Sequence, residues 1–176
     1  MSQQKIFLKA AWRNLLIANY TCNEEILKKY LPAHTELDTF NGQHLISLVA
    51  FQFLETKVLG IKFPFHTNFP EVNLRFYVKY NDKGTWKRGV VFIKEIVPKT
   101  MITFVANTFF NENYETMSMA QQVAIKQDAI YANYTWGKAN VFSAIADTQK
   151  VAMKDGSLEE FITEHFWGYS FVSANK

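Results

Sequence analysis

The stretch Glu71-Val72-Asn73-Leu74-Arg75-Phe76-Tyr77-Val78 alternates polar and apolar side chains without interruption. Successive side chains of a β-strand point to opposite faces of its sheet, so a period of two predicts a strand here. One face of this strand carries Glu71, Asn73, Arg75 and Tyr77, and the other carries the four apolar residues. We therefore expect the apolar face to lie in a hydrophobic core.

The surroundings of the polar face decide what this strand does. If the face meets bulk water, it is the wet side of a sheet, and Glu71 and Arg75 form a surface pair of little energetic value. If the sheet curls so that the face lines a cavity, a carboxylate, an amide, a guanidinium and a phenol converge there. Such a small set of polar groups is what a ligand pocket needs. The residues alone leave both interpretations open.

Hairpins are predicted on both sides of this strand. Alternating or β-branched runs separated by turn residues are typical of antiparallel pairs, and Asn-Gly tolerates the positive φ of the tightest turns. The predicted pairs are 69–80 with 86–97 around residues 81–84, 35–40 with 44–59 at Asn41-Gly42, and 127–136 with 140–147 at Gly137-Lys138. Residues 10–20 have a mixed pattern that fits either helix or strand.

Short helices are predicted between the hairpins. Residues 23–31 begin with a capping asparagine and acidic residues, carry Lys28-Lys29 in the last turn, and stop before Pro32. Ser157 and Glu160 form a capping box ahead of an apolar helix face. For residues 100–110, helical spacing after Pro98 outweighs the β-branched content, and we favour a helix.

These elements predict a β-rich α+β fold, in which an antiparallel sheet of hairpins curls into a barrel or half-barrel. The chain of 176 residues, 48% of them hydrophobic, is in the range of a single domain, and we expect one domain over residues 1–176. Asn107 and the run 111–114 form a second polar cluster. Glu112 and Tyr114 in this cluster either point into the barrel mouth or are ordinary residues of a helix end.

Composition excludes several classes of function. A net charge of +3, with Lys and Arg spread along the chain, is too weak for a nucleic-acid-binding face. The lone Cys22 allows no internal disulfide, and there is no signal-peptide pattern or long apolar run, so we expect a cytoplasmic protein without a membrane segment. The four histidines lack metal-ligand spacing, and no glycine-rich nucleotide motif is present, so we expect neither metal nor cofactor.

Several motifs together resemble the YqjF-like family of uncharacterised proteins. They are Trp12 to Tyr20, Tyr30-Leu31-Pro32, Leu37-Asp38, Gly42, Phe51, residues 71–78, Gly89-Val90-Val91-Phe92 and residues 156–165. The resemblance implies the fold of acetoacetate decarboxylase, a curled antiparallel β-structure around a cavity. It also implies that Glu71 matches a cavity glutamate of that enzyme. The segment 111–114 falls where the resemblance places the Schiff-base lysine pair, and it contains no lysine, so we expect no imine chemistry.

Two functional hypotheses follow. The first is a binding protein, or an enzyme of unknown reaction, with a central cavity lined by Glu71, Asn73, Arg75 and Tyr77 and closed near Glu112 and Tyr114. A small organic acid would suit Arg75, whose guanidinium can hold a carboxylate through two hydrogen bonds. The alternative is a structural or interaction module whose barrel is filled by its own aromatic side chains.

The resemblance also implies more chain after residue 169 than this sequence contains. We therefore expect residues 169–172 to form a strand at or near a sheet edge. Exposed edges pair readily with another chain, so we expect self-association, most simply as a two-fold dimer. Lys94 and Lys99 are expected to be exposed.

Overall fold

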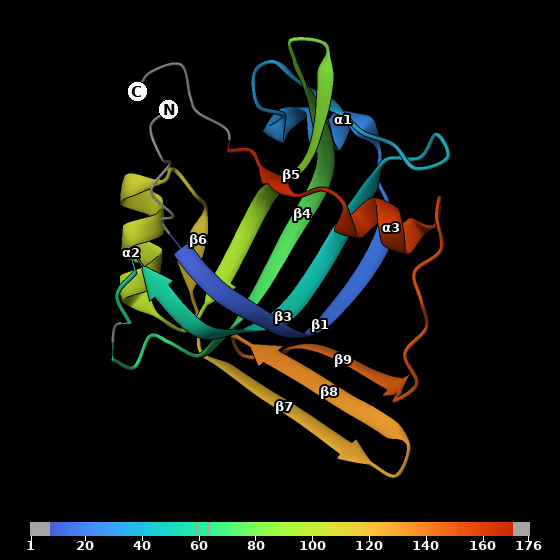
Figure 1. Cartoon of the computed structure of the whole chain (residues 1–176). Coiled ribbons are helices and arrows are strands. Elements are labelled where there is room, and N and C mark those ends of the chain that lie inside the picture. Colours follow the sequence, from blue (N-terminus) through green and yellow to red (C-terminus); the bar gives the residue numbers. More distant parts are fainter. Residues whose placement is uncertain (1–7, 59, 63, 171–176) are drawn as a thin grey trace.

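A computed structural model describes residues 8–58, 60–62 and 64–170 (Figure 1). The larger sheet has the strand order β1-β3-β4-β5-β10, with β2 beside β4 and β6 beside β5. The smaller sheet has the order β7-β8-β9. The strands are β1 Leu8–Thr21, β2 Thr35–Leu37, β3 Leu45–Val58, β4 Phe69–Asp82, β5 Thr85–Val97, β6 Tyr114–Thr116, β7 Met119–Lys126, β8 Ala129–Trp136, β9 Asn140–Asp147 and β10 Trp167–Gly168. The helices are α1 Glu24–Leu27, continued by a 3-10 turn at Lys28–Tyr30, α2 Thr100–Phe109 and α3 Leu158–Thr163.

The larger sheet is strongly curled (Figure 1). Its described strands form an open path, because β1 and β10 lie at opposite ends of the order. The β-rich α+β prediction is confirmed, and the curled sheet corresponds to the half-barrel of that prediction, since the described strands do not close. We call the face that carries Glu71, Asn73, Arg75 and Tyr77 the inner face.

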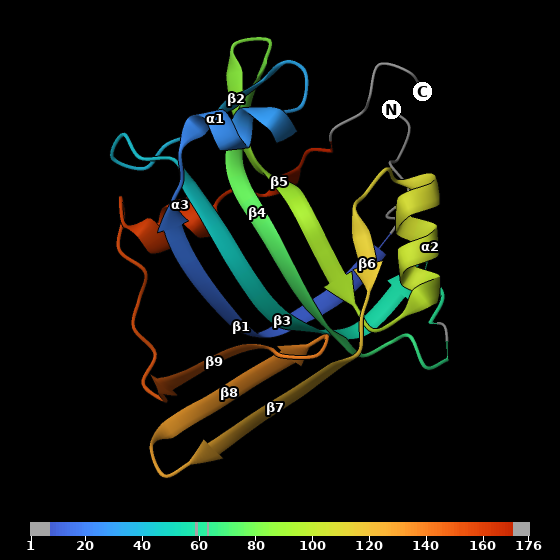
Figure 2. The ribbon, with the colours of Figure 1, turned by 180° about the vertical axis from the view of Figure 1, so that it is seen from behind.

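Both faces of β4 are covered, which explains why nine of its first ten residues are buried. On the outer face, Leu27 of α1 packs against Phe76 and Val78. The small sheet lies against this face as well (Figure 2). Tyr134 of the small sheet and Val72 belong to one buried hydrophobic cluster. The predicted core face is therefore confirmed, and the polar face is buried as well rather than wet.

Two of the predicted hairpins are confirmed. β4 and β5 pair antiparallel from Asp82↔Thr85 onward, and the turn residues Lys83 and Gly84 have the positive φ values of 53° and 90° that a tight turn requires. β8 and β9 pair antiparallel around Gly137. Sequence reasoning missed β7, which pairs with β8 and makes the hairpin a three-stranded sheet.

The hairpin predicted around Asn41-Gly42 is wrong in its pairing. The tight turn is present, with φ of 50° and 76° and reciprocal backbone hydrogen bonds between Phe40 and Gln43. The preceding strand β2, however, pairs with β4 through Thr35↔Tyr80 and not with β3. β3 instead pairs with β1, which resolves the ambiguous residues 10–20 as strand. Local turn chemistry therefore identified the bend but not the partner of the strand before it.

The predicted helices are confirmed. The Asn23 side chain caps α1 by accepting from the Glu25 N–H. The Ser157 side chain caps α3 by accepting from the Glu160 N–H. α3 covers one end of the inner face, where Phe161 packs against Tyr77. α2 covers the other end, where Ile102 contacts the aromatic core of β3 and β4.

The end of the described chain differs in detail from the prediction for residues 169–172. The strand at the sheet edge is β10, Trp167–Gly168, which pairs in parallel with β5. Tyr169 still donates a backbone hydrogen bond to Val90 O at 2.9 Å. Residues 171 and 172 lie outside the described residues. Strand formation therefore begins two residues earlier than expected.

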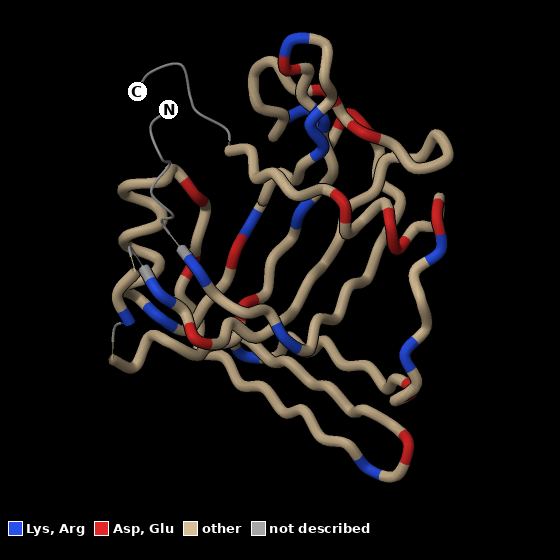
Figure 3. Tube along the Cα trace, in the orientation of Figure 1, with Lys and Arg blue, Asp and Glu red and all other residues tan. Residues whose placement is uncertain are grey.

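Acidic and basic residues are interspersed along the described chain (Figure 3). This distribution agrees with the weak net charge of +3. Within the described residues, no helix is both long and apolar enough to cross a membrane.

Candidate functional site

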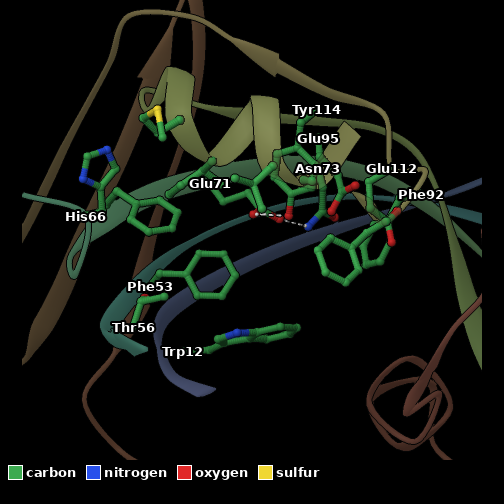
Figure 4. Close-up of a pocket in the computed structure, with 16 residues that line it drawn as sticks. Trp12, Phe53, Thr56, His66, Glu71, Asn73, Phe92, Glu95, Glu112 and Tyr114 are labelled. Atoms are coloured by element: carbon green, nitrogen blue, oxygen red, sulfur yellow. Dashed lines mark hydrogen bonds between the residues drawn. The ribbon is translucent and has the colours of Figure 1, made fainter. Parts of the chain in front are cut away.

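A cavity of about 410 Å³ lies between the inner face and α2 (Figure 4). Its volume falls within the usual range for small-molecule sites. Most of its wall is apolar, and Trp12, Phe53, Phe69 and Phe92 supply aromatic surface from four strands. The Trp12 ring lies 5.9 Å from the Phe53 ring in an edge-to-face arrangement. The cavity is thus a hydrophobic space walled by rings.

A compact polar cluster occupies one side of this cavity, across from Trp12 and Phe53 (Figure 4). Asn73 Nδ2 donates to Glu71 Oε1 at 2.9 Å, and the Tyr114 hydroxyl donates to Glu71 Oε2 at 3.1 Å. The members of the polar cluster are Glu71, Asn73, Glu95, Glu112 and Tyr114.

Strand pairing brings Glu95 into the polar cluster. Asn73 lies directly opposite Glu95 in the β4–β5 ladder, so both side chains point to the inner face. A bulge leaves Ile93 without a partner between the pairs Leu74↔Lys94 and Arg75↔Phe92. The bulge reverses the alternation of β5, which is why Phe92 and Glu95, three residues apart, both line the cavity.

Tyr114 reaches the polar cluster because α2 and β6 are joined by reciprocal hydrogen bonds. Asn107 of α2 donates through Nδ2 to Tyr114 O at 2.9 Å and accepts through Oδ1 from Tyr114 N at 2.8 Å. A hydroxyl pair, Thr103 with Thr116 at 2.7 Å, adds a second link. The Asn113 side chain donates to the carbonyl of the bulged Ile93 at 2.6 Å. Residues 113 and 114 are therefore hydrogen-bonded both to α2 and to the bulge of β5.

Burial changes the acidity of the polar cluster. Glu95 is 3% exposed and Glu71 is 2% exposed. Removal from water raises the pKa of both carboxyls, because the charged form loses hydration. For Glu95 the nearby Glu71 and Glu112 charges raise the pKa further. Burial also raises the pKa of Glu112, and it raises the pKa of the Tyr114 hydroxyl well above its ordinary value.

Two oxygen atoms of the polar cluster have no hydrogen-bond partner within residues 8–58, 60–62 and 64–170. They are Asn73 Oδ1 and Glu95 Oε2. Both belong to side chains that are at least nine-tenths buried and that line the cavity. Buried acceptors usually find donors, so these atoms mark a place where a partner is missing.

Of the six site residues predicted from the sequence, the structure brings four together. These are Glu71, Asn73, Glu112 and Tyr114. Arg75 and Tyr77 lie on the same face but under α3, outside the cavity wall. The Arg75 guanidinium donates to Ile162 O at 3.4 Å, and the Tyr77 ring lies 5.1 Å from Phe161.

The α3 end of the inner face has its own polar contacts. The Tyr77 and Ser47 hydroxyls are 2.6 Å apart. Asp38 Oδ2 accepts from Arg88 Nε at 2.8 Å and lies 3.1 Å from His165 Nε2. Although partial burial opposes ionisation, the hydrogen bonds from His165 and Arg88 lower the pKa of Asp38 to about 2. Through these bonds Asp38, which follows β2, links His165 after α3 to Arg88 of β5.

Sequence reasoning missed Glu95 and the aromatic wall. The hairpin prediction offered a signal for part of this set, because residues opposite one another in a hairpin share a face. That signal would have placed Lys94 in the cavity in place of Glu95, since the bulge was not foreseen. Lys94 instead points away and pairs with Glu115 at 2.7 Å. Lys94 and Lys99 are half-buried, not exposed as expected.

The cavity wall contains no lysine or arginine in the described part of the chain. His66 is the basic residue of that wall. Nor do the described residues contain a group of three or more His, Cys, Asp or Glu side chains arranged to hold a metal ion.

Comparison with known sequences finds one family profile over most of the chain. Residues 9–174 match DUF2071, described as an uncharacterized conserved protein. The chain is 35% identical over 109 residues to the uncharacterized protein YqjF of Bacillus subtilis (strain 168), a match that covers 61% of this chain and 43% of YqjF. The match therefore spans less than half of that relative.

Comparison with solved structures finds the acetoacetate decarboxylase fold. The Legionella pneumophila acetoacetate decarboxylase has a TM-score of 0.62 at 12% identity, covering 90% of this chain and 56% of that one. An acetoacetate decarboxylase-like enzyme from Sphingomonas wittichii RW1 has a TM-score of 0.51 at 11% identity, covering 76% and 54%. The enduracididine biosynthesis enzyme MppR, complexed with pyruvate, has a TM-score of 0.52 at 8% identity, covering 76% and 54%. At these identities the likeness concerns the fold alone.

Proposed function

The chain belongs to the DUF2071 family of uncharacterized conserved proteins, and because that description carries no activity, we propose from the cavity itself that the protein binds a small, largely apolar organic molecule. The observation that carries the proposal is the cavity of about 410 Å³, with aromatic walls and a buried polar cluster on one side. An apolar space with a few convergent polar groups is the usual form of a ligand site. One fold neighbour, MppR, is complexed with pyruvate, which supports the binding of a small organic molecule but not the apolar character of the ligand.

The rival hypothesis is an interaction module whose interior is filled by its own side chains. The volume of the cavity favours ligand binding, because well-packed interiors leave few voids larger than a water molecule. Two buried acceptors without partners favour it as well, since an interior built only for packing would pair or omit them.

Imine chemistry is not part of the proposal. A Schiff base needs an amine in the cavity, and the described wall offers no lysine. The position opposite Asn73, which the uninterrupted hairpin register would give to Lys94, is held by the carboxyl of Glu95. We therefore propose binding and assign no reaction.

The proposal is tested by blocking the cavity. Ala106 of α2 lines the cavity, and Ala106→Phe would fill part of it with a ring, whereas Thr108→Phe places the same ring on the exposed side of the same helix. We expect small aromatic molecules to raise the melting temperature of the wild type and of Thr108→Phe, because a ligand that binds the native state stabilises it. Ala106→Phe should lose that response. Equal responses of all three proteins would place binding elsewhere and contradict the proposal.

A further inference from the structure

Two buried oxygen atoms in the polar cluster have no hydrogen-bond partner within the described residues. Asn73 Oδ1 and Glu95 Oε2 lie on opposing residues of the β4–β5 ladder, so one ligand group can approach both. The remaining oxygens of Glu71 already accept from Asn73 and Tyr114. A ligand that completes this cluster must therefore bring N–H or O–H donors. A carboxylate, which only accepts, would leave Asn73 Oδ1 unpaired.

The charge of the cavity points in the same direction. Three carboxyls line it, and neither lysine nor arginine contributes to the wall within the described residues. Arg75, the cation on which an organic-acid ligand would depend, is directed to Ile162 O under α3. An anionic ligand would thus face three carboxyls, while the positive charge of Arg75 lies outside the cavity wall and acts on Glu71 from a distance.

The opposite wall suits a cation as well. Trp12 and Phe53 present rings to the cavity across from the polar cluster, and Phe92 lies beside the cluster (Figure 4). Aromatic faces attract cations through their quadrupoles, and the attraction grows when the site excludes water. Rings together with carboxyls form the environment that favours an ammonium group attached to an apolar body.

Resting on the proposed function, we propose that the cavity selects an apolar molecule bearing a protonated primary amine, whose N–H groups donate to Asn73 Oδ1 and Glu95 Oε2. The apolar body of the ligand then lies against Trp12 and Phe53. The three N–H groups of an ammonium can satisfy both acceptors and leave one for a further carboxyl oxygen.

Binding of such an amine is coupled to proton release. The Glu71, Glu95 and Glu112 carboxyls face the site, with the Tyr114 hydroxyl and His66 also in the wall and Arg75 farther along β4. Burial raises the pKa of the carboxyls, so part of them is protonated before the ligand arrives. An adjacent ammonium favours the charged form of a carboxyl, and the displaced proton enters the buffer.

A matched ligand series tests the inference on the whole chain. The probes are 3-phenylpropylamine, 3-phenylpropan-1-ol and 3-phenylpropanoate, which share one apolar body. By titration calorimetry at pH 7 we expect the amine to bind roughly tenfold or more tightly than the alcohol, because hydrogen bonds to charged groups are the stronger ones. The binding heat of the amine should vary with the ionisation enthalpy of the buffer in the sense of proton release.

Variants locate the preference. Glu95→Gln should reduce the advantage of the amine over the alcohol to about threefold or less. Glu115→Gln removes an acidic charge outside the cavity wall and should preserve the advantage. An alcohol or carboxylate that binds wild type as tightly as the amine overturns the amine inference and leaves the proposed cavity function standing. Failure of all three probes to bind overturns both.

Discussion

The buried carboxyl of Glu95 makes the free energy of unfolding depend on pH. Its side chain is buried beside Glu71 and Glu112, and its pKa is raised above 4.5, the ordinary value for a glutamate. The unfolded chain releases this proton near pH 4.5, whereas the folded protein retains it to higher pH. The unfolded state therefore binds fewer protons above pH 4.5, and the stability of the folded state falls as pH rises.

We predict that Glu95→Gln removes this part of the pH dependence. The variant should match the wild type near pH 4.5, where Glu95 is neutral in the folded state, and should melt roughly 3 °C or more higher at pH 8. Melting temperatures across this pH range provide the measurement. Glu115→Gln, at a half-exposed carboxyl that is paired with Lys94, serves as the control. Parallel pH profiles for wild type and Glu95→Gln would show that Glu95 is not the source of the slope.

At the residue scale, alternation along one strand predicted a core face, on which Val72, Phe76 and Val78 are buried and Leu74 is half-buried, and it predicted the clustering of Glu71 with Asn73. It could not predict that Asn73 lines the cavity and Arg75 does not. Both side chains point to the inner face, and the positions of α2 and α3 determine which of them contacts the cavity. Those helix positions depend on contacts far apart in the sequence. The prediction of an organic acid depended on Arg75 and remains untested.

At the element scale, one bulge decides the chemistry of the cavity. Continuing the register of the Asp82↔Thr85 pair without interruption would place Lys94 opposite Asn73, whereas the unpaired Ile93 places Glu95 there. No glycine marks the bulge in the sequence. It is held in part by Asn113, whose side chain donates to the Ile93 carbonyl from a different segment. The sequence predicted the hairpin from its turn but carried no local signal for the bulge.

The pairing partner of β2 is a second feature that the local sequence did not predict. Asn41-Gly42 predicted a tight turn correctly, because these residues accept positive φ. β3 has β1 along one edge and β4 along the other, so β2 pairs instead with β4, from Leu37↔Val78 onward, beyond the end of the β3–β4 ladder. The residues of a turn do not indicate which of several distant strands will pair with the strand before it.

The contact between α2 and β6 yields a second prediction. α2 contains no fully buried residue, so the paired hydrogen bonds between Asn107 and Tyr114 contribute much of its attachment. Asn107→Ala should lower the free energy of unfolding by about 1–2 kcal/mol and increase amide hydrogen exchange in α2 and β6. Thr108→Ala, on the exposed side of α2, provides the matched control. Unchanged exchange in α2 of Asn107→Ala would assign the attachment to apolar contacts such as those of Ile102.

At the scale of the whole molecule, the curled sheet is covered by different elements on each face. α2 and α3 share the inner face, and α1 and the small sheet cover the outer face (Figures 1 and 2). This division separates the cavity from the contacts that hold the two sheets together. The Tyr134 hydroxyl, for example, donates to Asn14 O at 2.8 Å and joins the small sheet to β1. Substitutions in the cavity therefore need not disturb the packing between the sheets.

The edge formed by β10 leads to the last prediction, which concerns assembly. β10 has β5 on one side and no described strand on the other. Its own Trp167 is 51% exposed, and the preceding Phe166 is 82% exposed. Exposed edges and apolar side chains favour pairing with a second copy, so we predict a reversible two-fold dimer through this edge. Sedimentation velocity over a range of concentrations should show a monomer–dimer equilibrium.

The dimer prediction is sharpened by matched variants. Phe166→Ser should shift the equilibrium toward monomer, because it removes an exposed ring beside the edge, while Val151→Ser alters a side chain that is 87% exposed elsewhere and should leave the equilibrium unchanged. Gly89→Ala provides a backbone variant, since a Cβ at Gly89 would clash with Trp167 O and displace β10 from β5. Displacement of β10 should weaken a dimer that uses this edge. A wild-type protein that sediments as a monomer at every concentration would contradict the prediction, and a dimer indifferent to Phe166→Ser and Gly89→Ala would place the interface on another surface.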